Sequence, residues 1–263
     1  MSRLVCFLLA GAVLAPGMAA AQMQPHRAEY ALHLGLGPNA ARIGTAVQDL
    51  ALDCSGWHLK RTIRTEIVLT TSWKMTLSSK LDADEPRSGN GLRYSALQIQ
   101  NGSERETKGK VQRQGGELRA EIVQPGSPPN LFVLPPPTLM PIAAVNHLIE
   151  RLQAKATSFP ALMFDAEIAG DVFLIDVGEQ DEAHVRAARR ADKPVTMPSV
   201  KSWPVFMTFT RGRQQDQRPL FTVAAVAFDN GVLDRFTVDT GLVTVTADLQ
   251  ALEMRPPPNC PRS

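Results

Sequence analysis

The stretch that decides the fold is FTVAAVAFDNGVLDRFTVD, residues 221–239. In its first half, apolar residues recur at every second position, which is the period of a β-strand with one buried face. The triplet Asp229-Asn230-Gly231 then marks a tight turn, because Asn and Gly tolerate the positive φ angles of hairpin turns. We therefore predict an antiparallel hairpin that joins residues 220–228 to residues 232–239.

The same alternation recurs along most of the chain and predicts a series of half-buried antiparallel strands. The apolar positions of these strands are Trp73, Met75 and Leu77; Leu97 and Ile99; Trp203, Val205, Met207 and Phe209; and Val243, Val245, Ala247 and Leu249. The segment 104–110 is polar throughout, which is typical of an exposed edge strand or of a long hairpin arm.

One segment departs from the strand pattern. After the Pro-rich residues 125–137, Thr138 is placed to cap a helix that has Pro141 in its first turn and ends near Thr157. The apolar face of this helix contains Ile142, Val145, Leu148, Ile149 and Leu152. Residues 182–190 are rich in Ala and Arg, and we predict a strand there because strand-like stretches flank them.

The composition is that of an ordinary globular protein. The chain has 263 residues, of which 44% are hydrophobic, and 28 basic residues stand against 26 acidic ones. These values exclude a disordered chain, a collagen and a disulfide-dense miniprotein. A net charge of +2 gives no general electrostatic reason to expect nucleic acid or an anionic membrane as a partner.

The first 21 residues have the features of a cleaved signal peptide. Arg3 supplies a positive start, residues 4–13 are apolar, and Ala19-Ala20-Ala21 is a typical cleavage site. The alternative is an N-terminal membrane anchor, but the apolar run falls short of the ~20 residues that a spanning helix needs. We therefore expect export to the periplasm, a mature chain that begins at Gln22, and no transmembrane segment after cleavage.

Cys6 lies in the signal peptide, so its cleavage leaves two cysteines, Cys54 and Cys260. In an oxidising compartment two thiols normally pair, and the alternative is two free thiols. A Cys54–Cys260 bridge would join the start of the mature chain to its end. This arrangement favours one domain over residues 22–263.

Several short motifs, in this order and spacing, resemble the EipB-like cell-envelope-integrity family of exported proteins from Gram-negative alphaproteobacteria. The motifs are Ala28-Glu29-Tyr30, Asp53-Cys54-Ser55-Gly56-Trp57, Asp165, Gly170-Asp171, Lys201-Ser202-Trp203-Pro204-Val205 and Phe228-Asp229-Asn230-Gly231-Val232, followed by the terminal strand that leads to Cys260. The resemblance covers essentially the whole mature chain.

This resemblance implies a mainly β fold: a long antiparallel β-spiral, or open barrel-like sheet, with one central α-helix and closure by a Cys54–Cys260 disulfide. It also implies a soluble periplasmic protein that maintains cell envelope integrity and has no established enzymatic activity. The residues themselves agree with a non-enzyme, because the sequence contains no nucleotide-binding, nucleophile-elbow or zinc-protease motif. We expect no catalytic residues, metal or cofactor, although a site assembled from distant residues stays open.

Seven side chains are candidates for a ligand or partner surface: Trp57, Trp73, Trp203, Met207, Arg186, Arg189 and Arg190. The tryptophans would form an aromatic cleft, but their alternating positions favour a core role. The three arginines would bind an anionic envelope component, but a solvated charged face is the more common role of such residues.

Two functions of different classes follow. The first is a non-catalytic periplasmic protein that maintains the envelope by binding envelope components or other proteins. The second is a carrier of a lipid or other apolar ligand, in which the inner face of a curved sheet surrounds a cavity. The residues expected to line that cavity are Met75, Leu77, Met207 and Phe209.

Overall fold

A computed structural model describes residues 23–70, 72–167, 171–179, 195–198, 201–212 and 218–260. These residues form fifteen strands and one helix. The first strands are β1 (His26–Leu34), β2 (Arg42–Leu52), β3 (Gly56–Thr70), β4 (Trp73–Pro86), β5 (Gly91–Gln100), β6 (Ser103–Gln114), β7 (Glu117–Val123), β8 (Asn130–Leu134) and β9 (Thr138–Leu139). They are followed by α1 (Pro141–Gln153), β10 (Ser158–Asp165), β11 (Asp171–Glu179), β12 (Ser202–Arg211), β13 (Phe221–Phe228), β14 (Leu233–Asp239) and β15 (Thr244–Met254).

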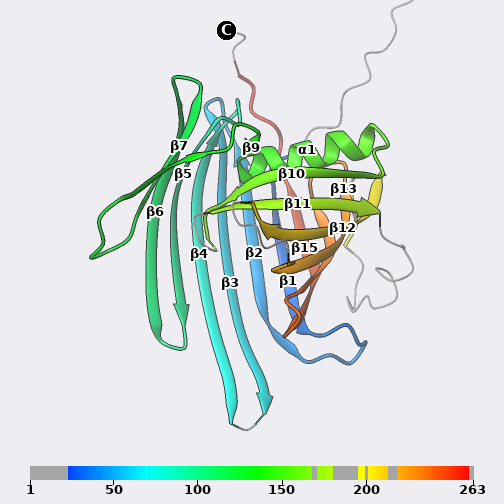
Figure 1. The fold of residues 1–263 in the computed structure, drawn as a ribbon. Helices are drawn as coiled ribbons and strands as arrows, with labels where there is room; N and C mark the ends of the chain where they lie inside the picture. Colours follow the sequence, from blue (N-terminus) through cyan, green and yellow to red (C-terminus); the bar gives the residue numbers. More distant parts are fainter. Residues whose placement is uncertain are drawn as a thin grey trace, which may run out of the picture.

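All fifteen strands belong to one sheet that winds back on itself. Its order runs from β8 down to β1, continues to β15, and then runs down to β9, so the first and last strands pair in the middle of the sheet. The two edges, β8 and β9, are consecutive in the sequence. Figure 1 shows β1–β8 as a tall wall and the later strands curling across its concave side. This architecture confirms the predicted barrel-like sheet, which is antiparallel except for the short edge strand β9, parallel to β10.

The turns follow the local sequence. The predicted hairpin is confirmed, since β13 and β14 flank Gly231, whose φ is +88°. A side chain at Gly231 would collide with Met23, because its Cβ would lie 2.4 Å from Cγ of that residue. Residues 104–110 lie in β6 and form a hairpin arm with β5. Residues 108–110 also pair with β7, whereas residues 104–107 pair with β5 alone, so the edge-strand prediction is right for that half of the segment and wrong for the other.

Helix α1 corrects two predictions. It begins at Pro141 with Met140 as the N-cap, and Thr138 lies in β9 instead of capping the helix. It also ends at Gln153, before the predicted Thr157. No side chain within the segment caps the N-terminus; the carboxylate of Glu85 on β4 accepts hydrogen bonds from the first backbone N–H groups instead.

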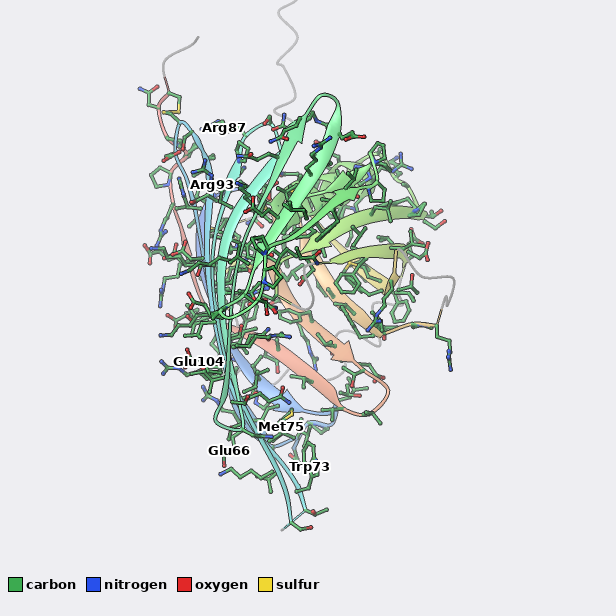
Figure 2. The ribbon with its side chains drawn as sticks, turned by 60° about the vertical axis from the view of Figure 1, so that its left-hand side comes forward. Glu66, Trp73, Met75, Arg87, Arg93 and Glu104 are labelled. Carbon is green, nitrogen blue, oxygen red and sulfur yellow. A yellow bond between two sulfur atoms is a disulfide. The ribbon has the colours of Figure 1, made fainter. Side chains whose placement is uncertain are left out.

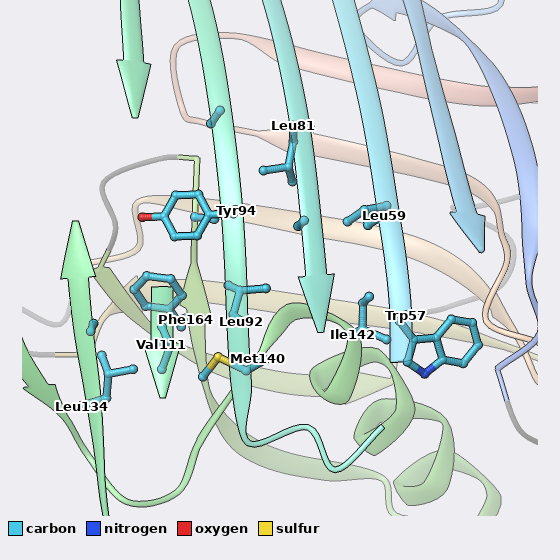
Figure 3. Close-up of a cluster of buried hydrophobic side chains, with 14 of the residues drawn as sticks. Trp57, Leu59, Leu81, Leu92, Tyr94, Val111, Leu134, Met140, Ile142 and Phe164 are labelled. Carbon is cyan, nitrogen blue, oxygen red and sulfur yellow. The ribbon is translucent and has the colours of Figure 1, made fainter. Parts of the chain in front are cut away.

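The helix fills the space between the wall and the curled strands. Ile142 and Ile149 belong to a first buried cluster with side chains of β2–β8, β10 and β11, while Leu148 and Leu152 belong to a second cluster with β10–β13. Figure 3 shows the first cluster, with the wall side chains beside the helix. A third cluster lies between β1, β2 and β15, and Ile67 of β3 and Val232 also belong to it. One helix thus joins two of the three cores.

A glycine lets an aromatic ring lie within this wall. Gly109 on β6 is directly opposite Tyr94 on β5, and a Cβ at Gly109 would lie 2.6 Å from the Tyr94 ring. The ring therefore covers the backbone of β6 and contacts Phe164 of β10, with ring centroids 6.1 Å apart. This contact joins the wall to the curled strands.

A polar cluster closes the same interface. Glu167, in the turn after β10, forms an ion pair with Arg61 of β3 and accepts a hydrogen bond from the Ser79 hydroxyl of β4 at 2.9 Å. The side-chain amide of Gln98 on β5 donates to the backbone carbonyl of Glu167 at 3.2 Å. We call these four residues the Glu167 cluster; it holds the β10–β11 turn against three strands of the wall.

Candidate functional site

The disulfide lies at one end of the wall. Cys54 and Cys260 are joined, with their Cα atoms 5.5 Å apart and 206 residues of separation between them. This confirms the predicted bridge. The C-terminal segment is also held before the bridge, because the Arg255 guanidinium forms an ion pair with Asp49 and its backbone N–H donates to the Pro25 carbonyl. The disulfide thus fixes the tail to the β2–β3 turn.

An imidazole lies between two carboxylates beside this bridge. Nδ1 of His58 is 2.5 Å from Asp84 Oδ1, and its Nε2 is 2.9 Å from Asp53 Oδ2. Both contacts raise the pKa of His58, with Asp84 contributing most. The pKa of Asp53 is lowered by hydrogen bonds from the Ser55 hydroxyl, the Gly56 N–H and His58, in that order. The pair of aspartates therefore favours a protonated His58.

Arg87 links the β4–β5 turn to the same end of the molecule. Its guanidinium Nη2 donates to the Asp53 carbonyl oxygen at 2.7 Å and lies 3.5 Å from Sγ of Cys260. The Arg87 guanidinium thus contacts both Asp53, which precedes Cys54, and the sulfur of Cys260. Figure 2 shows Arg87 at this end of the wall, with Arg93 nearby.

Charged side chains extend from His58 on β3 over the outer face of the next four strands. Successive cross-strand pairs place five side chains in one row, which we call the outer row: His58, Asp84, Arg93, Lys110 and Glu121. These residues come from β3, β4, β5, β6 and β7 in turn. Because side chains alternate between the faces of a strand, all five point away from the core.

Two neighbouring hollows lie along the outer row. One of about 730 Å³ is lined by Asp84, Arg93, Lys110 and Glu121 among others, and one of about 570 Å³ by His58, Asp84 and Arg93 among others. Lys110 is paired with Glu121, with Nζ 2.7 Å from Oε2. Arg93 has no ion-pair partner among the residues that the structure describes. The first hollow has a mainly polar lining, whereas the second also includes apolar side chains such as Leu92 and Val111, so together they suit a charged partner that also has an apolar part.

The sequence-predicted candidates do not come together. Trp57 is 8% exposed and lies in the first core cluster, which agrees with the core alternative. Trp203 and Met207 are partly buried against the second cluster. Trp73 is 41% exposed at the end of the β3–β4 hairpin. The whole predicted strand 182–190, which contains the three arginines, lies outside the described residues.

The residues expected around an inner cavity are also separated. Met75 is packed against the third cluster, whereas Met207 is packed against the second and Phe209 is buried within it. Sequence reasoning missed the outer row, because its members are spread over five strands and become neighbours only through strand register. The signal that was available is the charged alternation of β4, where Asp82 and Asp84 follow Lys80.

The described residues hold no group of three or more His, Cys, Asp or Glu side chains suited to a metal ion. The helix that they form is too short and too polar to cross a membrane.

Comparison with known proteins identifies the family. The model of the EipB-like family matches residues 17–256. The structure is similar to the crystal structure of a beta-barrel-like protein of a domain of unknown function, DUF1849, from Brucella abortus. That similarity has a TM-score of 0.70 at 19% sequence identity, and it covers 89% of this chain and 99% of the Brucella chain. The chain has no significant match among curated proteins.

Proposed function

The chain belongs to the EipB-like family, and from that premise we propose that it is a non-catalytic periplasmic protein that maintains the cell envelope by binding a partner. It reaches the periplasm through the signal peptide of residues 1–21. The partner binds the outer row and its two hollows. Strands β1–β8 then form a rigid surface that binds the partner and catalyses no reaction.

The observation that carries this proposal is the position of helix α1 and strand β10 on the concave side of the wall. Buried side chains of both elements, including Ile149 and Phe164, join the first core cluster there. A partner therefore has better access to the outer face, where the hollows along the outer row lie. The same packing argues against the lipid carrier, because a carrier needs an open interior and its expected lining residues are in separate clusters.

The disulfide maintains the rigid surface of strands β1–β8. It closes a loop of 206 residues, and bridges of that span stabilise a fold by up to about 5 kcal/mol through the entropy of the unfolded chain. It also fixes Asp53 beside His58, which begins the outer row. Loss of the bridge therefore lowers the amount of folded protein and disturbs one end of the binding surface together.

A depletion strain tests the proposal. Depletion should sensitise cells to deoxycholate and to cell-wall antibiotics, and wild-type protein should restore resistance. Protein with Cys54→Ser and Cys260→Ser should be less abundant and should restore it poorly. Full resistance on depletion would overturn the envelope function.

A surface variant tests the binding site separately. Arg93→Glu reverses the cation of the outer row that has no ion-pair partner among the described residues, whereas Lys155→Glu reverses an exposed cation beyond the end of α1. Both proteins should accumulate to the wild-type level. Only Arg93→Glu should fail to restore resistance, and equal rescue by the two variants would exclude the outer row as the partner site.

A further inference from the structure

We propose that the end of the sheet opposite the disulfide docks on the surface of a lipid bilayer through three uncharged loop tips. The tips, which we call the apolar end, are residues 34–41, the described residues among 68–73, and residues 240–243; the sequences of these ranges are LGLGPNAA, VLTTSW and TGLV. The proposal rests on the proposed function only in placing the protein beside a membrane. It adds a second binding surface that uses none of the outer row.

The exposed apolar side chains carry the argument. Eight large hydrophobic residues are exposed in the described part of the chain, and half of them lie on these tips: Leu36, Val68, Trp73 and Leu242. Leu242 is 92% exposed and Leu36 is 57% exposed. Scattered exposed leucines are normal on a protein surface, but a concentration on adjacent loops at one end indicates an interaction site.

Strand register brings the tips to the same end. The β1–β2 loop adjoins the β14–β15 loop, because Gly35 N–H donates to the Thr244 carbonyl at 2.7 Å. The β3–β4 hairpin follows across β2, where Gly44 is opposite Thr65. Cys54 lies in the β2–β3 turn, at the far ends of those strands. The apolar end and the disulfide therefore occupy opposite ends of the wall.

The β3–β4 hairpin projects beyond its neighbours. Pairing with β2 stops at Thr65 and pairing with β5 stops at Leu77, so residues 66–70 and 73–76 form a ribbon of two strands. Five further residues at about 3.3 Å each carry its tip roughly 16 Å past the level of Thr65. Figures 1 and 2 show this ribbon as the longest projection at that end, with Trp73 near its tip. Ile67 is buried in the third cluster and Met75 packs against it, so the base of the ribbon is held by the core. The part beyond them, with Val68 and Trp73, is a two-stranded ribbon of marginal stability that contact with another phase would stabilise.

The chemistry of the ribbon favours a bilayer surface. Tryptophan has an apolar ring and a polar N–H, and it prefers the membrane interface for that reason. At the base of the tip, Lys74 Nζ is 2.9 Å from Glu66 Oε1, so the flanking charges neutralise each other. The free backbone edges of the ribbon limit its depth, because hydrocarbon does not tolerate unpaired N–H and C=O groups. The ribbon therefore reaches the headgroup region with Val68 and Trp73 and goes no deeper.

Tryptophan fluorescence provides the first test, with the full mature chain and vesicles of phosphatidylcholine, with or without phosphatidylglycerol. Trp57 is buried and Trp203 is half-buried, so Trp73 is the tryptophan that changes environment most. We expect a blue shift with both vesicle types, because the tips carry no charge. Trp73→Phe should abolish the shift while the protein still sediments with vesicles. No sedimentation of wild-type protein would overturn the proposal.

A matched pair of variants provides the second test. Leu36→Asp combined with Leu242→Asp places charges on two tips, whereas Leu131→Asp places one on β8, where Leu131 is 70% exposed. We expect vesicle binding to fall about tenfold or more in the double variant, because two leucines no longer enter the interface. Leu131→Asp should bind like wild type. Equal binding by all three proteins would overturn the proposal.

The two proposals fail separately. If vesicle binding is absent but depletion still sensitises cells, the membrane contact is wrong and the envelope function stands. If vesicle binding depends on the tips but depletion has no effect, the apolar end is a membrane-docking surface in a protein whose cellular role differs. Circular dichroism of each variant should match that of wild type, which excludes misfolding as the cause of lost binding.

Discussion

Oε2 of Glu85 accepts a hydrogen bond from the backbone N–H of Ile142 at 2.9 Å, across 57 residues of sequence. Its Oε1 accepts a second bond from the N–H of Ala143 at 2.8 Å. The carboxylate is 2% exposed. A strand of the wall thus supplies the cap that the helix itself lacks, and it places a carboxylate at the positive end of the helix dipole.

Removal of this cap should destabilise the fold. Glu85→Ala leaves the buried N–H of Ile142 and the partly buried N–H of Ala143 without an acceptor, and an unsatisfied buried donor costs about 1–3 kcal/mol. We expect the free energy of unfolding in urea to fall by roughly 2–4 kcal/mol. Glu104→Ala, on an exposed position of β6, should change it by less than about 0.5 kcal/mol. Equal effects of the two substitutions would show that the cap contributes nothing.

Burial also makes Glu85 sensitive to pH. Burial raises its pKa to about 7 from a usual value of 4.5, and the two backbone hydrogen bonds oppose that rise without cancelling it. The folded state therefore holds this proton more tightly than the unfolded state does. Stability from this group is fully present below pH 4.5 and is lost as the pH rises towards 7. The loss amounts to about 3 kcal/mol, on the scale of 1.36 kcal/mol per pKa unit.

Glu85→Gln checks this pH dependence, because glutamine does not titrate. Urea unfolding of wild-type protein between pH 4.5 and 7 should show the decline in stability, and the variant should lack most of it. Glu104→Gln should retain the wild-type slope. A slope shared by all three proteins would assign the decline to other groups.

These capping contacts show where sequence reasoning reaches its limit. The hairpin at Gly231 was predictable, because its alternation and its turn residues lie within twenty positions of one another. The cap of α1 was not, because the rule searches for a side chain next to the helix and Glu85 lies on β4. Thr138 satisfied the local rule but pairs with Leu162 of β10 in the sheet. Tertiary structure overrode a local preference there.

The candidate site shows the same limit more strongly. The disulfide was predictable because two cysteines follow the predicted signal peptide and can pair in one way. The outer row requires the register of four strand pairs, and each register depends on turns that the sequence does not specify uniquely. In the sequence, His58 belongs to no recognisable motif. It becomes part of a site only when Asp84 lies opposite it.

Asp84 should set the protonation of His58. The two flanking aspartates raise the pKa of His58 above its usual 6.5, so the stability from this contact is present below pH 6.5 and is lost as the pH rises through the higher folded value. In an NMR titration, Asp84→Asn should bring the pKa of His58 back towards 6.5. Asp82→Asn, which changes the partner of Lys60, serves as the control and should leave it raised. An unchanged value in Asp84→Asn would contradict the proposed contact.

Glu167 should stabilise the fold far more than an exposed ion pair does. Its side chain is 10% exposed, and Glu167→Gln leaves the guanidinium of Arg61 without its carboxylate partner at the interface between β3 and the β10–β11 turn. Because charged hydrogen bonds at such sites contribute more than neutral ones, we expect a loss of about 2–3 kcal/mol in the free energy of unfolding. Glu66→Gln breaks the exposed pair with Lys74 and should cost less than about 1 kcal/mol. Urea unfolding of the two variants in parallel checks the difference. Similar losses would mean that the curled strands are held to the wall by apolar contacts such as Tyr94 with Phe164, and not by the Glu167 cluster.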